Sequence, residues 1–108
     1  MASIHYLNEK LSDAVYKLAT GAGDVRSRLY SILDKIIILP EYSLPTDLKD
    51  ELLWIKNKLT EKDKTQYGND RGRTIRRMKN STGSKIAERI VDLQSRICDL
   101  IEEEDETK

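Results

Sequence analysis

Apolar residues recur every three or four positions along most of the chain, a spacing that predicts successive amphipathic helices. The first run covers positions 3–19, where Ser3 can cap the helix and Gly21 follows the last apolar residue. The second covers 25–39, behind Asp24. Its β-branched end also suits a strand, but the helical period leading into it favours helix. The third covers 46–61, with acids early and lysines late, as the helix dipole prefers.

The longest periodic stretch is 74–101. Its later apolar residues fall on one helical face because they are spaced by four and three in alternation: Ile86, Ile90, Leu93, Ile97 and Leu100. The polar patch Asn80–Ser84, which includes Gly83, favours caps and turns over helix interior. We therefore expect two helical pieces, about 74–80 and 84–102, joined at this patch, with one unbroken helix as the alternative.

These elements predict an all-α fold. It is a small bundle of three short antiparallel helices plus a longer C-terminal helix, bent or broken near Asn80–Ser84. Residues 1–101 form the single helical domain, and residues 102–108 form a disordered acidic tail. Positions 62–73 are polar and contain glycine, so we interpret them as the longest loop of the chain. Loops of this length in small domains are usually mobile or functional.

Composition limits the function. Charged residues make up 35% of the 108 residues, but 19 basic and 19 acidic side chains cancel, so any electrostatic attraction must be local. The chain has neither a hydrophobic run long enough to span a membrane nor a signal-peptide pattern, and we expect no membrane partner. A lone Cys98 suits a reducing compartment, and we expect a cytoplasmic protein.

The residue types needed for catalysis are scarce. The single His5 and the single Cys98 have no triad-like neighbours, so we predict no enzyme activity and no small-molecule substrate. Too few His and Cys are present for a zinc site, and the acidic tail lacks calcium-loop spacing, so no metal or other cofactor is expected. Residues 80–85 fail the phosphate-loop pattern because Ser84 separates Gly83 from Lys85.

The segment 71–89 is strongly basic, with a single acid, Glu88. Its cations are the candidate partner-binding residues: Arg71, Arg73, Arg76, Arg77, Lys79, Lys85 and Arg89. Such a cluster can bind a nucleic-acid backbone without sequence specificity. An acidic protein partner, or pairing with this chain's own acids, would explain the same charges. No aromatic residue is interleaved, so the sequence does not indicate base stacking. The acidic tail is expected to compete for these cations.

Two further features suggest contacts. Trp54 lies off the main apolar stripe of its helix, so it either packs in the core or anchors a partner. The heptad-like run Ile86–Leu100 could pair with a second copy. The sequence thus predicts a small non-enzymatic binding module that docks nucleic acid or an acidic protein through residues 71–89. The alternative is a structural or regulatory protein that self-assembles, as a homodimer for example, or joins a complex through the apolar face of its last helix.

Overall fold

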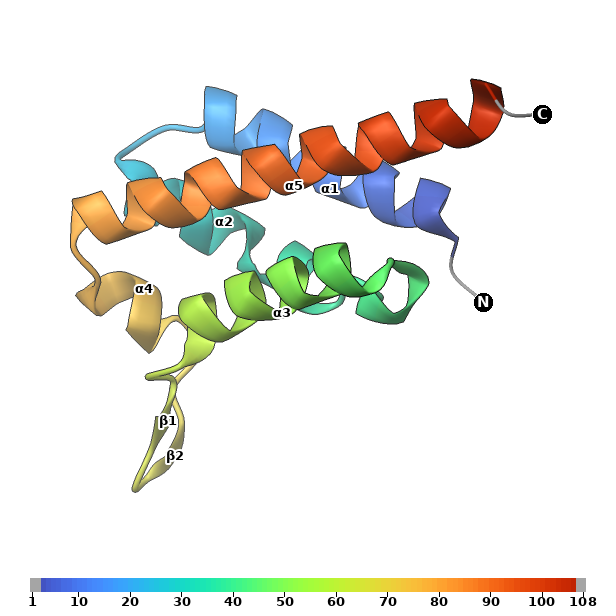
Figure 1. Cartoon of the computed structure of the whole chain (residues 1–108). Coiled ribbons are helices and arrows are strands. Elements are labelled where there is room, and N and C mark those ends of the chain that lie inside the picture. The colour runs from blue at the N-terminus through green and yellow to red at the C-terminus, as the bar shows by residue number, and fades with distance from the viewer. Residues whose placement is uncertain (1–2, 107–108) are drawn as a thin grey trace.

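The last helix organises the molecule. In a computed structural model, which describes residues 3–106, the helices are α1 (Ile4–Thr20), α2 (Val25–Ile37), the short 3₁₀ helix η1 (Glu41–Ser43), α3 (Thr46–Thr60), α4 (Arg73–Arg77) and α5 (Asn80–Glu106). Helix α5 packs against α1, α2 and α3 and runs opposite to α3 (Figure 1). The prediction of an all-α bundle with a longer C-terminal helix is confirmed.

The core is built from the apolar stripes seen in the sequence. Four side chains of α5 are at most 1% exposed: Ile86, Ile90, Leu93 and Ile97. They meet buried leucines and isoleucines from the other helices, among them Leu11 of α1, Ile32 of α2 and Leu52 of α3. Burying a Leu or Ile side chain stabilises a fold by about 1.5–3 kcal/mol, so this shared core holds the four helices together.

Side-chain caps begin the first two helices as predicted. Ser3 Oγ accepts a hydrogen bond from the backbone N–H of Tyr6 at 3.2 Å. Asp24 Oδ1 accepts one from the N–H of Ser27 at 3.0 Å. This bond, together with the bond from Arg26, lowers the pKa of Asp24. Helix α2 ends at Ile37, two residues before the predicted end, and the following residues form no strand.

The break in the C-terminal helical region is real, but it lies earlier than predicted. The chain is extended at Met78, between α4 and α5, and Asn80–Ser84 forms the first turns of α5. Gly83 is buried there because α5 approaches α2 closely. A Cβ at this position would lie 3.0 Å from Val25 Cγ1 and 3.4 Å from Leu29 Cδ1. The glycine therefore serves close helix packing and does not soften the helix.

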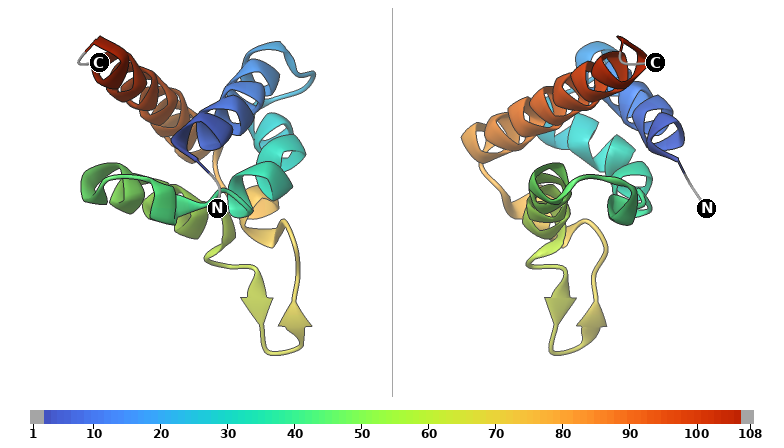
Figure 2. Two further views of the ribbon diagram at one scale, coloured as in Figure 1. Left: turned by 90° about the vertical axis from the view of Figure 1, so that its right-hand side faces the viewer. Right: turned by 45° about the vertical axis from the view of Figure 1, so that its right-hand side comes forward.

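The predicted structureless loop 62–73 is instead built around a β-hairpin, and this prediction was wrong. Strands β1 (Lys64–Thr65) and β2 (Gly68–Asn69) pair antiparallel, with Lys64 opposite Asn69 and Thr65 opposite Gly68. Thr65 Oγ1 donates to the carbonyl of Gly68 at 3.0 Å and accepts from the N–H of Tyr67 at 3.2 Å, which closes the turn. The hairpin projects away from the helices (Figure 2).

The acidic end of the chain continues α5. The helix runs through to Glu106, over positions that the sequence placed in a disordered tail, and residues 107–108 lie outside the described part. Neither glycine nor proline follows Leu100 to end the helix, and glutamate is a good helix former.

Candidate functional site

The last turns of α3, the short helix α4 and the first turns of α5 meet at one end of the bundle (Figure 1). Residues from these three elements line a groove. We call it the basic groove. Its volume is about 540 Å³. Trp54, Met78 and Ile86 give it apolar lining, and Thr82 adds a hydroxyl. Its cationic lining residues come from all three elements and the segments beside them: Lys58, Lys62, Arg77, Lys79 and Lys85.

Most of these cations are not paired with any carboxylate that the structure describes. Lys58 Nζ lies 3.7 Å from Glu61 Oε2, the one carboxylate among the residues that line the groove. Among the side chains that the structure describes, Lys62, Arg77, Lys79 and Lys85 have no carboxylate partner. Like charges on a concave surface reinforce each other's potential, so the groove should attract anions.

The break between α4 and α5 shapes this groove. Because the backbone is extended at Met78, Arg77 at the end of α4 and Lys79 in the connection just before α5 line one hollow. Arg26 of α2 donates to the Met78 carbonyl at 3.4 Å and so holds the break against the bundle. In one continuous helix, the directions of these two side chains would instead be set by the helical rotation between positions 77 and 79.

Trp54 joins the groove to the core. It is half-buried, packs against the core cluster and also lines the groove. The core-packing interpretation therefore holds in part, and contact with a partner stays a prediction. The guanidinium of Arg89 lies 4.8 Å from its ring centroid, and Lys58 Nζ lies 5.8 Å from it. Arg89 Nη1 also donates to both carboxylate oxygens of Glu51, at 3.0 and 3.2 Å. Arg89 is therefore neutralised beside the groove.

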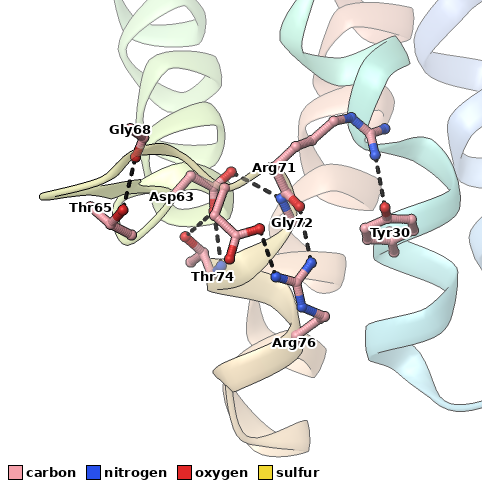
Figure 3. Close-up of polar contacts among 9 residues, drawn as sticks. Tyr30, Asp63, Thr65, Gly68, Arg71, Gly72, Thr74 and Arg76 are labelled. Atoms are coloured by element: carbon pink, nitrogen blue, oxygen red, sulfur yellow. Dashed lines mark hydrogen bonds and ion pairs between the residues drawn. The ribbon is translucent and has the colours of Figure 1, made fainter.

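Two other predicted arginines support the fold. Arg71 binds Asp34 at 2.7 Å, and its guanidinium lies over the Tyr30 ring. It also donates to Tyr30 Oη at 2.9 Å (Figure 3). The hydrogen bond to Asp34 raises the pKa of Arg71. Arg76 binds Asp70 at 2.9 Å and donates to the carbonyl of Arg71 at 3.0 Å. Both residues are therefore paired within the fold and lie outside the basic groove.

The predicted residues thus separate into two groups. Arg77, Lys79, Lys85 and Trp54 come together in the basic groove, whereas Arg71, Arg76 and Arg89 are paired with carboxylates. Arg73 lies outside the groove and lines a neighbouring hollow under the hairpin.

Lys58 and Lys62 were not predicted. Their signal was in the sequence, since Trp54, Lys58 and Lys62 are spaced by four and follow one face of α3 and its end. Their basic neighbours from 77 to 85 are distant in sequence, so only the fold shows that the two sets share a groove.

A buried carboxylate holds the hairpin next to this groove. Asp63 is 5% exposed; its Oδ1 accepts from the N–H and the hydroxyl of Thr74, at 2.8 and 2.7 Å, and its Oδ2 accepts from the N–H of Gly72 at 3.2 Å (Figure 3). The Thr74 hydroxyl accepts in turn from the N–H of Lys62 at 2.8 Å. This network joins the end of α3 to the start of α4 across the base of the hairpin.

Comparison with known proteins gives no family. No protein-family model, curated protein or solved structure matches this chain significantly. In residues 3–106, no three His, Cys, Asp or Glu side chains are grouped to hold a metal ion. Within the same range, every helix is too short or too polar to cross a bilayer. The function must therefore be argued from the groove itself.

Proposed function

We propose that the chain binds the sugar-phosphate backbone of a nucleic acid through the basic groove. The observation that carries the proposal is the convergence on one hollow of four cations that have no carboxylate partner among the described side chains: Lys62, Arg77, Lys79 and Lys85. Lysine and arginine neutralise phosphates and release counterions, which requires no particular base sequence. The Thr82 hydroxyl is placed to add a phosphate hydrogen bond.

The charge distribution along α5 supports a directed approach to a polyanion. The basic groove is lined by residues at its N-terminal end, whereas most of its acidic residues, from Asp99 to Glu106, lie in its last turns. The two ends of α5 lie at opposite ends of the molecule (Figure 1). Twenty-seven helical residues separate the two ends by about 40 Å. That distance exceeds the screening length of about 8 Å in physiological salt. Contrary to the expectation from sequence, we therefore propose that the acidic end does not compete for the cations of the same molecule. Instead, the separation of positive and negative charge along α5 orients the molecule so that the basic groove faces the polyanion.

The alternative function has less support from the described residues. Of the apolar run that would mediate self-assembly or entry into a complex, only Leu100 is partly exposed. The other four residues are at most 1% exposed: Ile86, Ile90, Leu93 and Ile97. An acidic protein remains the competing partner, and the test below includes it. We also infer a cytoplasmic location, since the single cysteine, Cys98, is a free thiol.

Salt dependence tests the proposal. The protein is titrated into a fluorescently labelled 20-nucleotide single strand and a duplex of the same sequence, at 50 and 200 mM salt. Four phosphate contacts predict that affinity falls about 50- to 150-fold between these concentrations. The variant Arg77→Gln/Lys79→Gln/Lys85→Gln should remove most of the binding and most of the salt dependence.

A matched variant controls for overall charge. Lys17→Gln/Lys35→Gln/Lys49→Gln makes the same change in formal charge with residues that do not line the groove. It should bind almost as tightly as the parent chain. Equal losses in both variants, or binding to acidic polypeptides such as polyglutamate but to neither nucleic acid, would overturn the proposal.

A further inference from the structure

The hairpin carries an aromatic ring far from any core. Tyr67 lies in the turn between β1 and β2, and its side chain is 91% exposed. None of the residues from Lys64 to Asn69 is buried. In both views of Figure 2 the hairpin extends beyond the helices. A large ring kept in water contributes nothing to the core and is available for a ligand.

The base of this hairpin is nevertheless firmly held. Burying a carboxylate is costly unless hydrogen bonds compensate it, and Asp63 receives three from Gly72 and Thr74. Gly72 has a φ of 83°, and a Cβ there would lie 2.3 Å from a ring carbon of Tyr30, so the chain is closely packed where it leaves the hairpin. The fold thus fixes the direction of an element whose tip packs against no other element.

The hairpin and the basic groove form one continuous surface. The hollow under the hairpin has a volume of about 830 Å³, and its lining includes Tyr67, Lys64 and Arg73. Two carboxylates, Glu61 and Asp70, also line it, and they pair with Lys58 and Arg76. Lys62 lines both this hollow and the basic groove. Lys64 and Arg73 have no carboxylate partner among the described side chains, so the track of uncompensated charge reaches the hairpin.

We propose that the ligand is a single-stranded nucleic acid and that Tyr67 stacks on one of its unpaired bases. Lys62, Lys64 and Arg73 would hold the phosphates between this base and the basic groove. An exposed tyrosine ring offers a stacking face to any base, whereas the bases of a duplex are already stacked on each other. This inference rests on the proposed function and adds to it the preferred strand state and a base-contacting residue.

Removing the ring tests the inference. Affinity is measured for a 15-nucleotide single strand, for an abasic strand of equal length and for the corresponding duplex. Tyr67→Ala should lower affinity for the single strand about 5- to 150-fold and leave affinity for the abasic strand unchanged. Tyr67→Phe should bind like the parent chain because it keeps the ring. Tyr16→Ala, at a side chain 68% exposed on α1, is the matched control and should have no effect.

The outcomes separate the two proposals. Unchanged binding of the single strand by Tyr67→Ala, or tighter binding of the duplex than of the single strand by the parent chain, overturns the stacking role and leaves backbone binding standing. An equal loss on the abasic strand also overturns it, since the ring would then act on the backbone or on folding. If the parent chain binds none of the three ligands, the proposed function itself fails.

Discussion

Arg89 covers the Trp54 ring at 4.8 Å while its guanidinium binds Glu51. A cation over an indole is attracted by the ring's negative face, and the carboxylate cancels its charge toward solvent. Lys85 lies one turn earlier on the same helix, lines the basic groove and has no carboxylate partner among the described residues. Two cations four positions apart therefore have different electrostatic roles.

This difference predicts which cation binds a polyanion. Lys85→Gln should weaken binding to a single-stranded oligonucleotide and lower the slope of log affinity against log salt by about 1, because one phosphate contact is lost. Arg89→Gln/Glu51→Gln removes a matched ion pair, so it should leave both the affinity and the slope nearly unchanged. Fluorescence titrations at several salt concentrations measure both quantities. A larger loss for the ion-pair variant than for Lys85→Gln would contradict this assignment.

The periodic spacing of the apolar residues predicted the helical part of the fold. The apolar stripes gave the four main helices, and Ser3 and Asp24 were identified as caps because short polar side chains before an apolar run have few other roles. The hairpin was missed because its strands are only two residues long, too short for a period-two pattern.

The groove could be predicted only in part. The basic stretch was visible, but the ion pairs that remove Arg71 and Arg89 from the site join residues 37 and 38 positions apart. The surface shared by Trp54, Lys62 and Lys85 could not be predicted from sequence either, because it depends on α3 and α5 packing side by side. Such pairings are set by the tertiary fold, and no local pattern records them.

Gly72 is expected to tolerate no side chain. Its φ of 83° is strained for other residues, and an added Cβ would approach Tyr30 Cε2 to 2.3 Å. Gly72→Ala should therefore lower the free energy of unfolding by about 2 kcal/mol or more, measured by urea denaturation. Gly68→Ala is the control, because Gly68 also has a positive φ but its Cβ would meet nothing within 4 Å. Similar losses in both variants would show that the contact with Tyr30 is unimportant.

The Asp63–Thr74 contact should determine the stability of the hairpin base. Thr74→Val keeps the shape but removes the hydroxyl that donates to Asp63 and accepts from the N–H of Lys62. Asp63 keeps its two backbone N–H donors, but it loses one hydrogen bond and the N–H of Lys62 loses its acceptor, which together should cost about 1–3 kcal/mol. Hydrogen exchange at the amides of Lys62 and Gly72 should accelerate. Thr74→Ser retains the hydroxyl and should behave nearly like the parent chain; faster exchange in both variants would point to the lost methyl group instead.

Acid should weaken the contact between η1 and α3. Lys56 Nζ binds Glu41 Oε2 at 2.7 Å, and this hydrogen bond lowers the pKa of Glu41 below its ordinary value of 4.5. Folded protein thus binds the Glu41 proton less readily than unfolded protein does. The resulting stabilisation is complete above pH 4.5 and is lost as pH falls through the lower pKa of the folded state.

Glu41→Gln isolates this effect. At pH 7 it should lower the free energy of unfolding by up to about 1 kcal/mol, because the pair is partly exposed to solvent. Well below pH 4 the parent chain has itself lost the carboxylate charge, so the two proteins should converge in urea midpoint. Lys56 also donates to the Leu39 carbonyl, a bond that Glu41→Gln leaves in place and that therefore cancels in the comparison. A stability difference that stays constant from pH 7 to pH 3 would mean that the ionised carboxylate contributes nothing to the packing of η1 on α3.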